Sequence, residues 1–459
     1  MSRRVLFFTV LAILALSAAA CGVAAAPAAP TSQAPASPAA TSAPAAALTK
    51  TPAAAASAQG APVELTYLFR ITTPASSTFQ QWVADQFNEK YKGKIHVTIR
   101  SVDDETYKTK LVVELGSPTP PDVFFSWEGG RAKSVIDAGL AEPLDQYYKQ
   151  YNWDKIFTPG ALTLATFGGK KYFVPTEMGT AVVWYRPDIY KKYNLSVPKT
   201  WDELAANAET FKKNGIAPFI LANQKAWPAQ FEWTTLLVDT AGLDVYQQLL
   251  DNKIPWTDPR VVAAWTKLKE IVDKGYFYPA INSLDVAPAV VLFSQGKAAM
   301  WYQGAFMLGN FKGSRDTIPF PIDFFPFPQI GDRKPVMEVT AESTLMIHSK
   351  SPHKAEAAEF INFFVSPEVQ KKKIVTDRPF AANTNTDLSV LSPLEQRLWK
   401  EMRNAGEVTF MHVDHAFTPA IANKFLDATQ ALVGGAMTPE QAAQMTEEEA
   451  VKVRGPVKP

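Results

Sequence analysis

Two histidines and an aspartate late in the chain have side chains that commonly bind metal ions. His412 and His415 are three residues apart, so both imidazoles would lie on one face of a helix, with Asp414 beside them. The chain has only 5 histidines, and no carboxylate at helical spacing completes a set of ligands. The sequence therefore predicts no metal site and no cofactor.

Aromatic residues beside Gly or Pro are the more informative feature. The sequence holds no GxSxG, HExxH or phosphate-cradling glycine loop, but 12% of its residues are aromatic and 11 are tryptophan. Trp127 and Glu128 directly follow Val123–Phe125, an apolar run that predicts a short buried strand. In open α/β sheets, ligands bind beyond the carboxyl ends of strands, so this pair is a candidate binding position.

The elements around this pair alternate between strand and helix patterns. Apolar periodicity predicts strands over residues 64–70 and 95–100 and helices over 77–91, 104–115 and 131–138. The acidic run Asp103, Asp104 and Glu105 caps the second of these helices, because anions stabilise the first turn. Alternating strands and helices indicate an α/β fold, with an open sheet and crossover connections.

The second half of the chain is richer in helices. The patterns predict strands over residues 181–186, 219–224 and 298–302 and helices over 200–215, 233–241, 259–274, 352–364 and 419–433. Thr200 and Glu203 have the spacing of a capping box at the start of the first of these helices.

The start of the chain is typical of an export signal. Arg3 and Arg4 precede an apolar run, Val5–Leu16, that is too short to remain as a membrane span. Small residues then lead to Cys21, the only cysteine, and this stretch resembles a bacterial lipobox. The resemblance implies a signal peptide over residues 1–20 and a lipidated Cys21; the alternative is ordinary secretory cleavage beside a chance cysteine. Two acyl chains would give stable anchoring.

Residues 21–62 predict a disordered tether behind that anchor. They consist almost wholly of Ala, Pro, Ser and Thr, with no charged residue before Lys50, and cannot build a core.

With 46 basic and 45 acidic residues, the chain has no bias toward nucleic acid. We therefore expect a monomeric folded part from Val63 onward, held at the outer face of the cytoplasmic membrane by Cys21.

Four blocks of sequence resemble the family 1 extracellular solute-binding proteins of bacterial ABC importers, which include maltose-binding-protein-like sugar receptors. They are PDVFFSWEGGRAKSVIDAGLAEPL (121–144), GGKKYFVPTEMGTAVVWYRPDIYKKYNLSVPKTWDEL (168–204), FSQGKAAMWYQGAF (293–306) and STLMIHSKSPHKAEAAEFINFFVSPEVQ (343–370). Their order and spacing are similar to the family over nearly all of residues 63–459. Each block alone is weak, but the four together are specific.

The resemblance implies a two-lobed periplasmic-binding-protein fold of type II, with the ligand in a cleft between the lobes. One lobe would comprise residues 63–177 and 340–380, and the other residues 178–339 and 381–459. A hinge crossed three times, near Glu177, Glu338 and Arg378, would join them. The chain would capture a sugar or oligosaccharide by hinge closure and deliver it to a separate ABC permease.

The resemblance also directs attention to particular loops. Carbohydrates present apolar C–H faces and hydroxyl groups, so their receptors combine aromatic platforms with planar polar groups. The candidate ligand contacts are Trp127, Glu128, Glu177, Trp227, Trp233, Trp301, Phe306 and Asp414. Trp82, Trp265 and Trp399 stand at helical spacing and are expected in the core.

Two other functions stay open. A receptor for another small polar solute, such as a polyol or a phosphorylated sugar, would differ in the charge that lines the cleft, because several Arg or Lys beside the aromatic residues favour phosphate. An exported glycosidase would need a carboxylate pair at a defined separation. No hydrolase signature supports the enzyme, so we expect a protein without catalytic activity.

Overall fold

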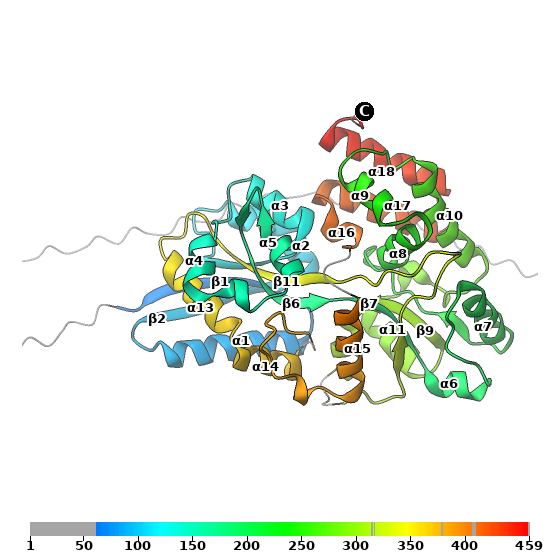
Figure 1. The fold of residues 1–459 in the computed structure, drawn as a ribbon, viewed down its shortest axis with the longest axis horizontal. Helices are drawn as coiled ribbons and strands as arrows, with labels where there is room; N and C mark the ends of the chain where they lie inside the picture. The colour runs from blue at the N-terminus through cyan, green and yellow to red at the C-terminus, as the bar shows by residue number, and fades with distance from the viewer. Residues whose placement is uncertain (1–60, 314, 316, 378–379, 406–409, 458–459) are drawn as a thin grey trace, which may run out of the picture. The chain divides into compact units, whose positions relative to one another are not determined.

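The structure is a computed structural model that describes residues 61–457 except 314, 316, 378–379 and 406–409. The expected signal peptide (1–20), Cys21 and nearly all of the expected tether (21–62) therefore lie outside the described residues. The described residues form one compact unit. Two main β-sheets organise it (Figure 1).

The first sheet has the strand order β2-β1-β3-β11-β6. Its strands are β1 (Val63–Ile71), β2 (Ile95–Asp103), β3 (Val123–Ser126), β6 (Val174–Gly179) and β11 (Thr340–Ile347). β1 runs parallel to β2 and β3, whereas β11 runs antiparallel to β3 and β6. Every residue of β3 is buried, which explains why its sequence is a continuous apolar run rather than an alternating one.

The helices and short elements that follow these strands in the chain are α1 (Pro74–Lys90), α2 (Asp104–Leu115), α3 (Gly129–Asp137), α4 (Asp145–Tyr151), η1 (Trp153–Lys155), α5 (Pro159–Ala165), the hairpin β4 (Thr166–Phe167) and β5 (Lys170–Lys171), α13 (Lys354–Phe364) and α14 (Pro367–Thr376). α1 buries Phe79, Val83 and Phe87, which recur at helical spacing, against this half of the core. The periodicity of the sequence therefore identified the buried face of α1 correctly.

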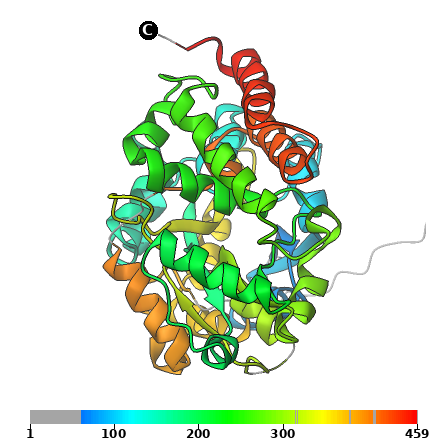
Figure 2. The same ribbon diagram turned by 90° about the vertical axis from the view of Figure 1, so that its right-hand side faces the viewer.

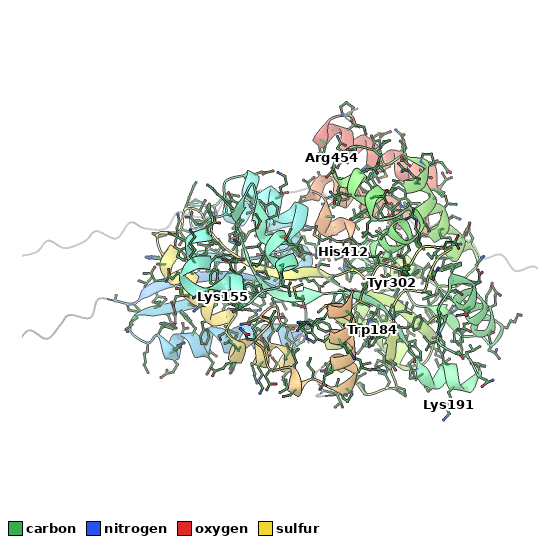
Figure 3. All side chains as sticks on the ribbon, in the orientation of Figure 1. Lys155, Trp184, Lys191, Tyr302, His412 and Arg454 are labelled. Atoms are coloured by element: carbon green, nitrogen blue, oxygen red, sulfur yellow. The ribbon has the colours of Figure 1, made fainter. Side chains whose placement is uncertain are left out.

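The second sheet has the strand order β10-β7-β9-β8. Its strands are β7 (Ala181–Tyr185), β8 (Ala217–Phe219), β9 (Ala298–Gly304) and β10 (Asp323–Phe325). β7 pairs antiparallel with β9 and β10, and β8 pairs parallel with β9. Figure 3 labels Trp184 on β7 and Tyr302 on the neighbouring β9.

Many helices surround the second sheet. In the chain between its strands they are α6 (Pro187–Lys192), α7 (Trp201–Lys213), α8 (Ala229–Ala241), α9 (Leu243–Leu250), α10 (Pro259–Asp273), η2 (Ile281–Ser283), α11 (Val286–Ser294) and α12 (Met307–Lys312); later come η3 (Leu388–Val390), α15 (Pro393–Asn404), α16 (Val413–Ala416), α17 (Pro419–Val433) and α18 (Pro439–Arg454). The capping box of α7 is confirmed: Glu203 N–H donates to Thr200 Oγ1 at 3.3 Å, and Thr200 N–H donates to the Glu203 carboxylate at 3.4 Å.

The C-terminal helices pack on the middle of the chain. α18 lies against α17 and α10, as the red and green helices of Figure 2 show. Trp265 of α10 is fully buried there and donates from Nε1 to Thr429 Oγ1 of α17 at 3.0 Å. Trp265 is therefore a core residue, as its helical spacing predicted, whereas Trp82 and Trp399, which were predicted in the core with it, are only partly buried.

The chain passes between the two sheets at short segments. β6 ends at Gly179 and β7 begins at Ala181, so only Thr180 separates the first sheet from the second. The chain returns between β10 and β11, where Glu338 stands two residues before β11. Arg378, the third expected crossing, lies outside the described residues, and the lobe boundaries given above stay a prediction.

Two sequence predictions about the second sheet were wrong or incomplete. The strand predicted over 219–224 ends at Phe219, and a turn at residues 224–225 precedes α8, where Asn223 Oδ1 accepts a hydrogen bond from Ala229 N–H. α8 begins at Ala229, four residues earlier than predicted. β10 was not predicted at all, because its three residues are too few to show an alternating pattern. Within residues 61–457, the part that the structure describes, no helix is both long and apolar enough to cross a bilayer.

Candidate functional site

A cavity of about 390 Å³ lies where the ends of β1 and β3 face α8, α12 and α16. This volume falls in the range of small-molecule sites, about 300–1,000 Å³. Trp127, Trp227, Phe306 and Asp414, four of the eight candidate contacts, line it. The cavity therefore stands beyond strand ends, as the rule for α/β sheets predicts.

One wall of the cavity is aromatic. Trp227, Phe231 and Phe306 form a triangle with ring centroids 5.9 to 6.2 Å apart. Trp227 and Phe306 are partly exposed, whereas Phe231 is buried beneath them. This wall presents an apolar surface to which the C–H face of a sugar ring could pack.

Trp127 is held differently. Its side chain is only 3% exposed, and the guanidinium groups of Arg70 and Arg131 lie 4.9 and 5.0 Å from its ring centroid. Most of the ring surface is therefore already covered. Trp127 contributes a small part of the cavity wall, and the open aromatic surface belongs to Trp227 and Phe306.

The charged groups that line the cavity are largely paired with one another. Arg70 binds Asp104 at 2.6 Å, and Lys108 lies 3.4 Å from Asp104 and 3.2 Å from Glu105. Asp103 caps α2 by accepting from Thr106 N–H at 3.0 Å, which confirms the capping prediction for this residue. The acidic groups in the lining (Asp103, Asp104, Glu105, Asp285, Glu342, Asp414) outnumber the basic ones (Arg70, Lys108, Lys225). This balance disfavours a phosphorylated ligand.

Asp414 on the short helix α16 is bound to α3. The Arg131 Nε–H donates to Asp414 Oδ1 and to its backbone carbonyl, both at 3.0 Å, and Nη2 also pairs with Oδ1. Burial opposes the charge of Asp414, but Arg131, with Lys108 beyond it, outweighs burial and holds the pKa of Asp414 well below its usual range. Asp414 is therefore a buried, ionised carboxylate that also reaches the cavity.

His412 and His415 lie on the same wall, with ring centroids 4.0 Å apart. His412 Nδ1 contacts Glu338 Oε1 at 2.6 Å, and His415 Nδ1 contacts Glu128 Oε1 at 3.0 Å. Figure 3 labels His412, and Figure 1 places α16 beside α8. In the described ranges, no group of three or more potential ligands is arranged to hold a metal ion.

The carboxylates set the charge of this histidine pair. Burial favours neutral His412, but the charge and hydrogen bond of Glu338 outweigh it and raise the pKa of His412. Burial and the nearby His412 lower the pKa of His415, although Glu128 acts in the opposite direction. The pair therefore takes up a first proton more readily than a second one.

Two glycines let α3 approach α16 closely. Gly129 has φ +65°, and a Cβ built on it would lie 2.4 Å from the His415 carbonyl oxygen. A Cβ on Gly130 would lie 2.2 Å from the Phe417 carbonyl carbon. Only glycine fits this contact, which holds Glu128 and Arg131 against α16.

Glu128 and Glu177 are brought to the neighbourhood of the cavity but do not line it. Glu128 is fully buried and accepts from Thr340 Oγ1 at 2.6 Å as well as from His415. Glu177 is buried beside a separate interior space of about 30 Å³, where Lys373 Nζ donates to it at 2.9 Å. Both carboxylates bind protein groups in this structure.

Trp233 and Trp301 lie in the core. Trp233 is in the middle of α8, with its ring centroid 4.7 Å from those of Trp265 and Phe425. Trp301 stands on β9, whose residues are all buried, and its ring packs on Phe293 and Phe311. The structure therefore does not bring these two side chains to the cavity.

Several lining residues were missed as binding candidates. Arg70 is near the end of β1 and could have been found by the strand-end rule that identified Trp127. Lys108 lies on α2, and Phe231 lies in the first turn of α8, where the sequence carries no signal for a cavity. His412 and His415 were considered only as metal ligands.

Two β-sheets covered by helices and joined by short crossings, with a solute-sized cavity beyond the strand ends, form an architecture that suits the binding of a small solute. The family model of the bacterial extracellular solute-binding proteins matches residues 71–371. The chain belongs to this family.

Individual relatives are distant. An uncharacterized ABC transporter extracellular-binding protein of Pyrococcus horikoshii is 28% identical over 61% of this chain and 63% of its own length. The alpha-glucosides-binding periplasmic protein AglE of Rhizobium meliloti is 26% identical over 59% of this chain and 62% of its own length. This chain thus spans a little under two thirds of the length of each of these two relatives.

Solved structures share the fold. The structure of a chitin oligosaccharide binding protein superimposes with a TM-score of 0.78 and 23% identity, over 85% of this chain and 99% of that one. The α/β periplasmic-binding-protein fold expected from the sequence is therefore confirmed, whereas its three-crossing hinge stays a prediction.

Proposed function

We propose that this protein is a lipid-anchored receptor that captures a sugar or oligosaccharide and delivers it to an ABC transporter permease. The observation that carries the proposal is the open aromatic wall of Trp227 and Phe306, which faces polar groups across a cavity of about 390 Å³. This is the combination that carbohydrate recognition requires. The names of the alpha-glucoside and chitin oligosaccharide binding proteins that the chain resembles support the same ligand class.

The ligand contacts that we propose are those that the cavity brings together. Trp227 and Phe306 stack on a sugar face, Trp127 closes one end, and Asp414 accepts from a hydroxyl group. Arg131 donates to Asp414 Oδ1. Oδ2 accepts no hydrogen bond from the described residues and is not counted as a buried atom without a partner, so it is accessible from the cavity. Oδ2 is therefore the oxygen available to the ligand.

Capture takes place by closure of two lobes, residues 63–177 with 340–380 and residues 178–339 with 381–459. The cavity supports this division, because Arg70 and Trp127 belong to the first lobe and Trp227, Phe306 and Asp414 belong to the second. A ligand that contacts both sets favours the closed state, because only its difference in affinity between the two states can shift their equilibrium.

The charge of the cavity favours a neutral sugar over a phosphorylated one, because Arg70 and Lys108 are already paired with carboxylates. A neutral polyol is compatible with the same polar groups but offers less flat apolar surface to the aromatic wall. The sugar is therefore the preferred ligand.

Calorimetric titration of the purified protein with maltose, melibiose, xylobiose, diacetylchitobiose, sorbitol and glucose 6-phosphate tests this proposal. We expect at least one neutral sugar to bind with about micromolar affinity, near 8 kcal/mol, and Trp227→Ala to weaken it at least tenfold, about 1.4 kcal/mol. Trp82→Ala is the matched control, because Trp82 is also partly exposed but lies on α1 beside a different groove. Flat traces for all four sugars together with binding of sorbitol or the phosphorylated sugar would overturn the sugar assignment.

The anchor is tested separately, because residues 1–60 lie outside the described part of the chain. Expression in a bacterial host with labelled palmitate should give a labelled, membrane-bound protein. Cys21→Ala should remove the label and release the folded protein, since Cys21 is the only thiol. An unlabelled wild-type protein would show ordinary secretion instead.

A further inference from the structure

Both histidines on the cavity wall use the same ring nitrogen to bind the protein. Nδ1 of His412 contacts Glu338, and Nδ1 of His415 contacts Glu128. Among the described residues, neither Nε2 atom has a hydrogen-bond partner. If these atoms were fully buried they would count as buried atoms without a partner, and they do not, so both are accessible. Both Nε2 atoms therefore keep access to the cavity that the two rings line.

The carboxylates determine what each Nε2 can do. A carboxylate accepts hydrogen bonds and does not donate them, so Nδ1 must carry the proton in each pair. In a neutral ring, Nε2 is then an acceptor; in a protonated ring it becomes a donor. When one ring of the pair is protonated, its Nε2 is a donor while the Nε2 of the other ring is an acceptor.

We propose that His412 and His415 are direct ligand contacts, whose Nε2 atoms bind neighbouring hydroxyl groups of the sugar, and that Glu338 and Glu128 are positioning residues that fix the tautomer of each ring. The inference rests on the proposed function and deepens it. It assigns to the pair a hydroxyl-binding subsite beside the aromatic wall. The ring centroids are 4.0 Å apart, so the two rings form one continuous part of the cavity wall.

The packing around the rings fixes their positions. His412 lies over Phe231 with centroids 4.5 Å apart, and His415 lies 6.3 Å from Trp127. The subsite therefore joins the aromatic wall on one side and the first lobe on the other. A ligand that binds both histidines also reaches the strand-end loop of β3.

The charged and titratable groups around the pair are few. Glu128 and Arg131 face it from the start of α3, Glu338 from the segment before β11, Asp414 from α16 itself, and Lys108 from α2 beyond Asp414. α8 presents Phe231 and Gln230, which do not titrate, and the Tyr246 hydroxyl of α9 donates to the Met411 carbonyl. Arg131 is bound to Asp414, so the charge of the subsite depends mainly on the two histidines and their two glutamates.

Long-range ¹H–¹⁵N spectra of the histidine rings test the proposal in the unaltered protein. The probe is the member of the panel (maltose, melibiose, xylobiose or diacetylchitobiose) that binds most tightly in calorimetry. Without sugar, both rings should show the Nδ1–H form at high pH, and addition of the sugar should shift both Nε2 resonances. The buried His348 is the internal control, because its Nε2 contacts the Leu115 carbonyl at 2.9 Å and its resonance should not move.

Variants then distinguish the residues that contact the sugar, His412 and His415, from the residues that position their rings, Glu338 and Glu128. His415→Gln should weaken binding of the same sugar at least tenfold, with His348→Gln as the matched variant that leaves affinity within twofold. Glu338→Gln should allow both tautomers of His412 and change the pH dependence of affinity, which loss of packing alone would not do. Unchanged thermal unfolding and near-ultraviolet circular dichroism identify the variants that remain folded.

The outcomes distinguish this inference from the proposed function. If none of the four sugars binds the wild-type protein while sorbitol or glucose 6-phosphate does, both the proposed function and this inference fail. If a sugar binds but neither Nε2 resonance moves, or if a folded His415→Gln variant binds it as wild type does, only the histidine subsite is overturned. Shifts at both Nε2 atoms with a tenfold loss in the variant support it.

Discussion

A single methyl group at Gly130 should separate α3 from α16. The residue lies in the first turn of α3, and no unusual backbone angle requires glycine there. By local propensity alone, Gly130→Ala would stabilise the helix by about 0.5–1 kcal/mol. The contact with α16 predicts the opposite sign.

The magnitude follows from the distances. The new Cβ would stand 2.2 Å from Phe417 C, 2.3 Å from Phe417 O and 2.7 Å from Thr418 N, all backbone atoms that cannot rotate away. Ordinary contact begins near 3.4 Å, so the two segments must part by about 1.2 Å, the difference between 3.4 and 2.2 Å. The Glu128–His415 bond, now 3.0 Å, would lengthen to about 4.2 Å and be lost.

We expect Gly130→Ala to destabilise the protein by about 1–3 kcal/mol, the usual cost of overpacking, and to weaken sugar binding because the Glu128–His415 bond breaks. Urea unfolding followed by tryptophan fluorescence measures the first effect and calorimetry the second. Gly116→Ala is the matched control, since its Cβ would meet only Val112 O at 3.3 Å and Val113 O at 3.7 Å. A Gly130→Ala variant as stable as wild type, or more so, would refute the reasoning.

Three further predictions concern buried polar and aromatic groups. Burial raises the pKa of Glu232 to about 8 from 4.5, so the folded protein keeps a proton there that the unfolded chain releases, and stability should fall as the pH rises toward 8. Glu232→Gln should remove this decline, worth up to about 5 kcal/mol, in urea titrations at several pH values; an unchanged pH profile would contradict it. Arg131→Met should cost about 3–5 kcal/mol by leaving Asp414 without its partner, and Arg131→Met/Asp414→Leu should recover most of the loss in the same assay, whereas an equal loss in both would exclude the pairing argument. Trp301→Phe should lower the melting temperature yet leave sugar affinity within about twofold, and a tenfold loss would mean that Trp301 contacts the ligand.

The fold could be predicted from the sequence because apolar periodicity and helix caps are local signals, and because four characteristic blocks follow one another in the expected sequence order. The run Val123–Phe125 and the capping box at Thr200 are local signals, and the structure confirms both. The strand end at Trp127 located one side of the cavity, because the direction of a strand fixes where its end lies. These features depend on neighbours in the sequence.

The site was harder to predict because burial depends on neighbours distant in the sequence. Trp233 and Trp227 are six residues apart, yet one is in the core and the other lines the cavity. The difference arises because Trp227 precedes α8, whereas Trp233 lies inside a helix whose residues from Ala229 to Asp239 are all buried. The partners Glu338 and Glu128 of the two histidines were not predictable, because they are 74 and 287 residues away from them.

The packing of α18 on α17 and α10 has a consequence for how the chain matures. Until residues 439–454 are synthesised, the apolar surface of α10 that they cover faces solvent. A chain that ends near residue 430 therefore contains every strand of the second sheet, β7 to β10, but leaves that surface of α10 without its covering helix, and exposed apolar surface of this kind promotes aggregation. Holding the nascent polypeptide extended until synthesis is complete would avoid that hazard.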